Sequence, residues 1–298
     1  MEVKSVFVVG CGFMGSGIVE NVASKGISAI AYDLSEQQFA KSRAGICKNL
    51  SKAVSKGKLT EEEKEATLNR ITYVDDLSMC KDADIIIEAA SENKEVKLKI
   101  MKEIDSYAKE GAIIASNTSS ISITSLGGVL KDPSHFVGMH FFSPVPKIPL
   151  MEVVKGYQTC KEAIKLSCEF GEFLGKACIV ANDEAGFIIN RMLSPMLNEA
   201  CVLVERNIGT IEDIDMGMKM GLHHPMGPLE LMDMIGIDVE LAVMEVFYSE
   251  TGDSKYRPAI SLRRMVDAGF LGKKVGKGFY IYHEDGTKTP NTQLPNLR

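Results

Sequence analysis

A glycine-rich turn between a buried strand and a helix constrains this chain more than any other feature. Residues 5–10 are apolar, β-branched and end at Gly10, which is the pattern of a buried strand, and a helical pattern then runs to about Lys25. The turn has the spacing Gly10-x-Gly12-x-x-Gly15. Gly10 allows a tight turn, Gly12 lets the backbone approach a pyrophosphate, and Gly15 lets the helix pack against the strand. The turn therefore predicts a dinucleotide site.

A carboxylate ends the second strand of this unit. Residues 28–33 have a strand pattern, and Asp33 follows Gly15 at roughly the 20-residue spacing typical of a ribose-binding acid. A carboxylate here repels a 2′-phosphate, and no arginine follows it directly, so we predict NAD rather than NADP. The free N–H groups at the helix start, around Phe13 and Met14, would face the phosphates. A purely structural glycine turn is the alternative, but it leaves Asp33 unexplained.

Length, charge and cysteine usage exclude several classes of protein. A chain of 298 residues favours two domains, and a net charge of −6 argues against a nucleic-acid partner. The N-terminus has no signal-peptide pattern, and no apolar stretch approaches the roughly 20 residues that cross a bilayer. Seven cysteines without a CxxC pair suit reduced thiols. We therefore expect a cytoplasmic protein that does not bind a membrane.

A metal site is not expected. Zinc needs clustered cysteine or histidine ligands, and the only histidines close in sequence are His223 and His224. Neighbouring side chains in a helix or a strand point apart, so this pair cannot share one ion.

Two helices interrupt the alternation of strands and helices after Asp33. Ser35 and Thr60 each have the spacing of a helix cap, and they predict an inserted helical pair whose first member ends near Lys56. Three lysines four residues apart form a basic stripe on that first helix: Lys48, Lys52 and Lys56. The stripe is either a binding surface for an anionic ligand or an ordinary solvated face.

The alternation then resumes and completes a mostly parallel sheet of the Rossmann type. Strand patterns occupy residues 84–90, 112–116, 136–142 and 178–182. Ligands of such sheets bind beyond the carboxyl ends of the strands. Four polar residues fall there: Glu92, Asn117, Ser119 and His140. We therefore expect them to share one cleft.

The composition changes near residues 183–185. Helical patterns cover residues 187–206, 210–220, 228 to about 251, and 258–268. We therefore expect an α/β domain over residues 1–184, an all-helical domain over 185–284, and a loose polar tail over 285–298. Apolar residues at exposed-looking positions of the helical domain suggest a homodimer.

A histidine, a carboxylate and small hydroxyl donors near a dinucleotide suggest a dehydrogenase. Oxidation of an alcohol requires removal of the hydroxyl proton, and imidazole, with an ordinary pKa of about 6.5, suits that transfer in both directions. Glu152 could hold His140 in one tautomer, while Ser119 and Asn190 could orient the substrate. Each of these residues alone is more simply explained as structural.

Several separated motifs resemble the L-3-hydroxyacyl-CoA dehydrogenase family, and in particular its short bacterial members that act on 3-hydroxybutyryl-CoA in fatty acid and butyrate metabolism. The resemblance covers about residues 3–282. It is carried by the glycine turn, Ala115-Ser-Asn-Thr-Ser-Ser120, Met139-His-Phe-Phe-Ser-Pro144, Met151-Glu-Val153, Ala185-Gly-Phe-Ile-Ile-Asn-Arg191, His224-Pro-Met-Gly-Pro228 and Gly272-Lys-Lys-x-Gly-Lys-Gly-Phe-Tyr280.

The resemblance implies roles for individual residues. It makes His140 the general acid/base, Glu152 its partner, and Ser119 and Asn190 contacts of the substrate. It implies NAD contacts from the glycine turn and from Asp33, Glu92, Lys97, Asn117, Ser119, Ser143 and Lys274. It also implies coenzyme A contacts from the helical pair, at Lys56 and at Asn49, which stands where the family usually has serine.

The chain departs from the family pattern next to the histidine. Ser143 replaces the usual asparagine, and Ile148-Pro149-Leu150 replaces the usual Met-Lys-Leu, a form that resembles the dehydrogenase portions of larger β-oxidation enzymes. Two alternatives remain. One is a two-domain dehydrogenase of a free 3-hydroxy acid, although such enzymes use a helix lysine that this chain lacks beside Asn190. The other is a non-catalytic NAD-binding relative.

Overall fold

The computed structural model describes residues 3–294 of the chain. These residues divide into two compact units, one ending at Phe187 and the other beginning at Ile188. None of the helices between residues 3 and 294 combines the length and the hydropathy that a membrane crossing requires. All seven cysteines are free thiols.

The first unit is built on an eight-stranded sheet with the order β3-β2-β1-β4-β5-β6-β7-β8. All neighbouring strands run parallel except β6 and β7, which are antiparallel. The strands are β1 (Ser5–Val9), β2 (Ser28–Tyr32), β3 (Ile71–Val74), β4 (Ile85–Glu88), β5 (Ile113–Ser116), β6 (Phe136–Phe141), β7 (Leu150–Lys155) and β8 (Ala177–Asn182). The predicted Rossmann-type, mostly parallel sheet is confirmed.

Helices cover both faces of this sheet because its central strands are apolar on both sides. Val6 and Val8 of β1 pack into one core with α1, while Phe7 and Val9 pack into a second core with α4. The helices of the unit are α1 (Phe13–Ser24), α2 (Glu36–Ser55), α3 (Glu61–Leu68), α4 (Lys94–Tyr107), α5 (Ile123–Gly127) and α6 (Lys161–Phe173), with 3₁₀ turns η1 (Leu77–Asp82) and η2 (Pro133–His135).

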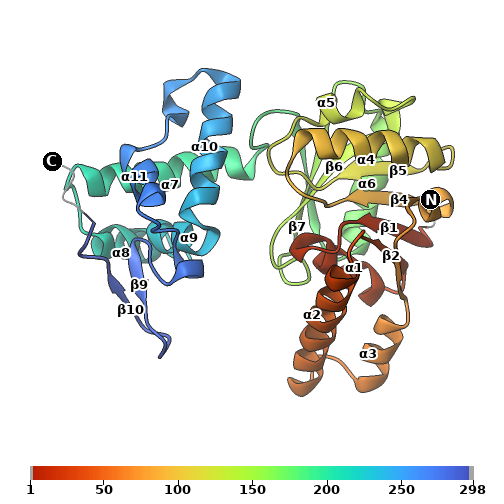
Figure 1. Ribbon diagram of the computed structural model, residues 1–298, viewed down its shortest axis with the longest axis horizontal. Coiled ribbons are helices and arrows are strands. Elements are labelled where there is room, and N and C mark those ends of the chain that lie inside the picture. The colour runs from red at the N-terminus through yellow and green to blue at the C-terminus, as the bar shows by residue number, and fades with distance from the viewer. Residues whose placement is uncertain (1–2, 295–298) are drawn as a thin grey trace. The chain divides into compact units, whose positions relative to one another are not determined.

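The inserted helical pair is α2 and α3, which contact each other and extend away from the sheet (Figure 1). Both helices begin at the residues that the sequence indicates. The Ser35 hydroxyl accepts from the Gln38 N–H at 3.4 Å, and Thr60 forms a full capping box with Glu63. Strand β3, which follows the pair, and helix α6 were not predicted; β3 is short and only partly buried, so its pattern is weak.

The second unit is helical, with a short hairpin added. Its elements are α7 (Ile189–Glu205), α8 (Ile211–Gly221), α9 (Pro228–Ile235), α10 (Ile237–Thr251), η3 (Ser254–Tyr256), α11 (Ile260–Asp267), η4 (Lys273–Val275), β9 (Tyr280–Tyr282) and β10 (Lys288–Pro290). The single helix predicted from residue 228 to about 251 is wrong. Gly236 divides it, because its φ of 110° lies outside the helical range.

The expectation of a loose tail after residue 284 is also wrong for the described part of that segment. Strand β10 pairs with β9, and the buried Asn291 donates from Nδ2 to the Gly278 carbonyl at 2.7 Å. Residues 295–298 lie outside the described part of the chain. The hairpin is anchored because the Asp233 carboxylate accepts from the N–H groups of Phe279 and Tyr280 at 2.8 and 2.9 Å. Composition alone does not reveal such anchoring.

Candidate active site

His140 and Glu152 occupy paired positions on the antiparallel strands β6 and β7. Their side chains meet on one face of the sheet, with His140 Nδ1 2.7 Å from Glu152 Oε2. Glu152 is fully buried and His140 is 6% exposed. Because the carboxylate is acceptor-only when ionised, it fixes the proton of a neutral imidazole on Nδ1 and leaves Nε2 as the acceptor.

Aromatic rings enclose the imidazole of His140. The ring of Phe142 lies 4.6 Å away between centroids, and that of Phe187 lies 5.6 Å away in an edge-to-face arrangement. These rings exclude water from two sides and restrict rotation of the imidazole. The imidazole is therefore held in one orientation.

Asn117 fixes the end of the strand that carries the histidine. Its Oδ1 accepts from the backbone N–H of Phe141 at 2.9 Å, so β6 is tied to the end of β5 next to His140. The Ser119 segment and the histidine are thereby brought to the same edge of the sheet, as the strand-end positions predict. The side-chain oxygen of Asn117 is therefore hydrogen-bonded to the protein's own backbone.

Glu92 organises the loop after β5. Its Oε1 accepts from Thr118 Oγ1 at 2.6 Å, from the Ser119 N–H at 3.0 Å and from the Ser120 N–H at 3.2 Å. Burial acts to raise the pKa of Glu92, but the attraction of Lys97 and these hydrogen bonds outweigh it, so the pKa lies below its usual value. Glu92 is therefore an ionised anchor that sets the position of Ser119.

Lys97 lies beneath Glu92 rather than beside open solvent. It is 1% exposed, and its Nζ lies 2.7 Å from Glu88 Oε1 and 3.4 Å from Glu92 Oε2. The other oxygen of Glu88 accepts from the Ser116 hydroxyl at 2.6 Å. Sequence reasoning missed Glu88 and Thr118 as parts of this site. In the sequence, Glu88 is recognisable as an acidic residue at the end of an otherwise apolar strand, and that strand is buried.

The glycine turn has the geometry that a dinucleotide requires. Gly10 has a φ of 104°, and a Cβ on Gly15 would lie 1.8 Å from the Gly10 carbonyl oxygen, so a side chain at either position would be strained. A Cβ on Gly12 would meet no atom within 4 Å, so the backbone there is open to a ligand. Asp33 accepts from the Cys11 N–H at 2.9 Å and so stands beside the turn. These residues fit the pyrophosphate and the ribose of NAD.

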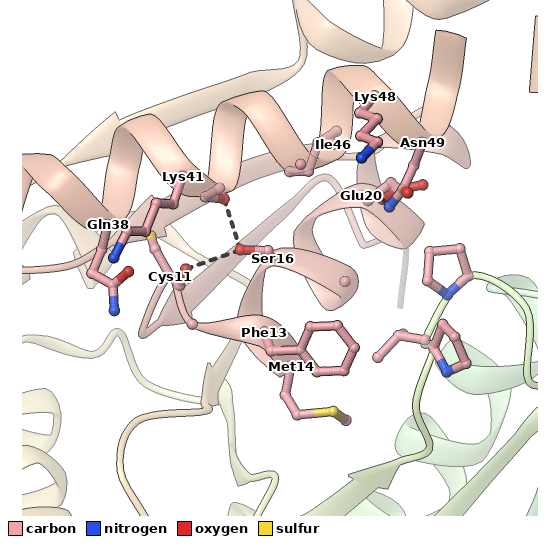
Figure 2. Close-up of a pocket in the computed structure, with 17 residues that line it drawn as sticks. Cys11, Phe13, Met14, Ser16, Glu20, Gln38, Lys41, Ile46, Lys48 and Asn49 are labelled. Carbon is pink, nitrogen blue, oxygen red and sulfur yellow. Dashed lines mark hydrogen bonds between the residues drawn. The ribbon is translucent and has the colours of Figure 1, made fainter. Parts of the chain in front are cut away.

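A pocket of about 460 Å³ opens between α1, α2 and the loop after β6. Figure 2 shows Glu20 and Asn49 meeting at one end of this pocket, with Gln38 and Lys41 at the other. The Ser16 hydroxyl donates to the Cys11 carbonyl at 2.9 Å in the wall between them. The predicted substrate contact Asn49 therefore lines a pocket, whereas Lys56 caps the far end of α2 and is exposed.

The remaining predicted residues are divided between the two units. Ser143 is exposed in the loop after β6. In the second unit, Asn190 is half-buried in the first turn of α7, and Lys274 in η4 forms an ion pair with Asp238, with Nζ 2.6 Å from Oδ2. Between residues 3 and 294, no three His, Cys, Asp or Glu side chains form a cluster suited to a metal ion.

Comparison with known proteins gives a consistent family. The family model described as "3-hydroxyacyl-CoA dehydrogenase, NAD binding domain" matches residues 5–184, and that described as "3-hydroxyacyl-CoA dehydrogenase, C-terminal domain" matches residues 186–282. The chain belongs to the 3-hydroxyacyl-CoA dehydrogenase family.

Relatives of this dehydrogenase family match over nearly their whole length. A probable 3-hydroxybutyryl-CoA dehydrogenase from Deinococcus radiodurans is 45% identical over 92% of this chain and 99% of its own. A 3-hydroxybutyryl-CoA dehydrogenase from Bradyrhizobium diazoefficiens is 44% identical over 94% and 96%. The crystal structure of (S)-3-hydroxybutyryl-CoA dehydrogenase from Ralstonia eutropha matches with a TM-score of 0.92 and 44% identity, over 95% of this chain and all of that one.

Membership of the 3-hydroxyacyl-CoA dehydrogenase family makes the chain an oxidoreductase with NAD as its cofactor. The family resemblance inferred from the sequence motifs is thereby confirmed. The open backbone at Gly12 and the position of Asp33 agree with this cofactor.

Proposed function

We propose that the protein interconverts (S)-3-hydroxyacyl-CoA and 3-oxoacyl-CoA with NAD, and that 3-hydroxybutyryl-CoA is its substrate. The observation that carries the proposal is the His140–Glu152 pair, with its 2.7 Å hydrogen bond, at the strand ends of an NAD-binding fold. Relatives more than 40% identical over nearly their full length carry this activity in their names.

His140 is the proton-transfer group in this proposal. Bound NAD supplies the hydride acceptor for the substrate carbon C3. His140 Nε2 takes the proton of the C3 hydroxyl during oxidation and returns one during reduction. Glu152 holds the imidazole through Nδ1 and stabilises its protonated form, as a carboxylate does beside a catalytic histidine. The flanking rings of Phe142 and Phe187 limit rotation of the imidazole away from Glu152.

Ser119 and Asn190 are assigned to the substrate. The Glu92 anchor holds the Ser119 backbone, so that its hydroxyl can donate to the oxygen on C3. Asn190 would contribute its side-chain amide to the same oxygen or to His140. Asn49 and Lys56, on the inserted pair, are assigned to the coenzyme A portion.

NAD contacts are assigned to the glycine turn, to Asp33 and to the loop after β5. Phe13 and Met14 offer backbone N–H groups at the start of α1, where the helix dipole favours phosphate. Asp33 would accept from the ribose hydroxyls. Glu92, Lys97, Asn117, Ser119, Ser143 and Lys274 are assigned to the nicotinamide half, and for Lys97 that contribution is indirect because its ammonium is enclosed.

We further assign residues 1–184 to cofactor binding and residues 185–284 to substrate binding and dimerisation, with the remaining residues as a short C-terminal extension. A homodimer in the cytoplasm is the expected form. Exposed apolar side chains of the helical unit, such as Met192 and Met220, would be covered in the dimer.

Initial rates of NADH and NADPH oxidation with 3-oxoacyl-CoA substrates of increasing chain length test the proposal. We expect turnover with acetoacetyl-CoA and a strong preference for NADH. Turnover of a free 3-oxo acid, without inhibition by coenzyme A, would instead support the free-acid alternative. Binding of NADH without oxidation by any of these substrates would support the non-catalytic one.

A further inference from the structure

A buried carboxylate lies at one end of the pocket between α1 and α2. Glu20, on α1, is 6% exposed and lines the pocket. Burial raises the pKa of its carboxyl, which the Asn49 hydrogen bond and the charge of Lys147 counteract. No step of the proposed hydride and proton transfer uses Glu20.

The partner of Glu20 determines what else can bind there. Asn49 Nδ2 donates to Glu20 Oε2 at 2.9 Å. Among residues 3–294, Glu20 Oε1 has no hydrogen-bond donor. Because the amide nitrogen of Asn49 is turned to Glu20, its oxygen Oδ1 remains available on the other side. This end of the pocket therefore presents acceptors, and it selects a ligand group that donates a hydrogen bond.

The surroundings of the two residues indicate the kind of ligand. Val145 and Pro146 supply an apolar wall. Lys48 lines the pocket beside Asn49 and begins the basic stripe that continues to Lys56 along α2. Eight residues of helix separate these two lysines by about 12 Å. A long, linear ligand with N–H donors in its middle and a phosphate at one end matches this order of groups.

We propose that Glu20, oriented by Asn49, accepts a hydrogen bond from an amide N–H of the pantetheine arm of the acyl-CoA substrate. The inference rests on the proposed function and adds a specificity-determining residue to it. The arm carries its amides between the thioester and the phosphates, so the basic stripe would follow on the phosphate side.

An enclosed carboxylate acceptor gives this contact a measurable effect. A hydrogen bond to a charged group contributes about 1.5–3 kcal/mol, which corresponds to roughly 10- to 100-fold in kcat/KM. The contact is far from C3 in the substrate and is made equally in the ground state and the transition state. We therefore expect it to act on KM, with little change in kcat.

The experiment compares two substrates in a Glu20→Leu variant. Acetoacetyl-CoA carries the amides, and the S-ethyl thioester of acetoacetate does not. Glu20→Leu should lower kcat/KM for acetoacetyl-CoA about 10- to 100-fold and leave that for the ethyl thioester unchanged. Glu20→Gln, whose amide oxygen can still accept, should lose less. Glu110→Leu, at an exposed site outside the pocket, is the matched control.

The outcomes separate this inference from the proposed function. Equal losses with both thioesters, or no loss with either, would overturn the role of Glu20 while leaving the activity in place. Absence of turnover in the unaltered protein would overturn both. Glu20→Gln keeps the test valid if Glu20→Leu does not fold, because it preserves the size of the buried side chain. It should produce a smaller loss in kcat/KM, again only with acetoacetyl-CoA.

Discussion

His140 and Glu152 are register partners across the antiparallel junction of β6 and β7. Directly opposed residues of an antiparallel pair lie on the same face of a sheet, so the junction itself brings imidazole and carboxylate together. The junction is the single reversal of direction in the eight-stranded sheet of the described chain. The contact between these two side chains, which we propose as the catalytic pair, is thus a consequence of the topology.

Replacing the histidine tests its role in proton transfer. His140→Gln should lower kcat by about 10²–10⁴, the usual contribution of general acid/base catalysis. NADH binding should persist, because the glycine turn and Asp33 are unchanged. Stopped-flow turnover and NADH fluorescence titration measure the two quantities. A variant with near-normal kcat would exclude His140 as the proton-transfer group.

Glu152→Gln separates orientation from proton transfer. The amide can still contact Nδ1, but it no longer stabilises a protonated imidazole. We expect kcat to fall by roughly 10²-fold or more with a small change in KM, because the carboxylate matters most when the imidazole is charged. An unchanged kcat with a raised KM would assign Glu152 to substrate binding instead. Circular dichroism of the variant checks that the buried substitution leaves the fold intact.

The sequence predicts those parts of the fold and site that rest on local patterns. The glycine turn, the strand ending at Asp33 and the position of His140 at a strand end all follow from short apolar runs and their boundaries. The split at Gly236 was not predicted, because the surrounding residues have helical spacing on both sides. The ordered hairpin after Gly278 was not predicted, because it is held by the carboxylate of Asp233, more than 40 residues earlier in the chain.

The buried ion pair between Lys97 and Glu88 could not be predicted from the sequence either, but its contribution to stability can be tested directly. Lys97→Met removes the partner of Glu88 and leaves a carboxylate buried without its counter-charge. Loss of one member of a buried pair costs about 3–5 kcal/mol in the free energy of unfolding. Urea denaturation should show this loss. The double variant Glu88→Leu with Lys97→Met should recover a large part of it, and two additive losses would mean that the residues do not interact.

Asp33 should control the choice of cofactor. Asp33→Ala removes the carboxylate that we propose as the acceptor for the ribose hydroxyls, together with its repulsion of a 2′-phosphate, and it also frees the Cys11 N–H. We expect KM for NADH to rise about tenfold or more and KM for NADPH to fall, measured with acetoacetyl-CoA at saturation. The ratio of kcat/KM values for the two cofactors is the decisive quantity. An unchanged ratio would show that discrimination lies elsewhere.

Glu240 should make the stability of the helical unit depend on pH. It is 3% exposed on α10, and burial raises its pKa from 4.5 to about 7, with a smaller opposing contribution from a hydrogen bond with Ser194. Between these two values the folded carboxyl keeps a proton that the unfolded chain releases. The free energy of unfolding therefore falls as pH rises from about 4.5 to about 7, and the cost persists above that range.

Glu240→Gln removes this titration, because an amide is neutral at every pH. The variant should match the unaltered protein near pH 4.5 and exceed it by about 3 kcal/mol in the free energy of unfolding above pH 7. Urea denaturation at a series of pH values measures the difference. Glu250→Gln, on the exposed face of the same helix, should give no such divergence. If the free energy of unfolding changed with pH in the same way for Glu240→Gln and the unaltered protein, Glu240 would be ionised in the folded state without penalty. A contact that neutralises its charge would then be required.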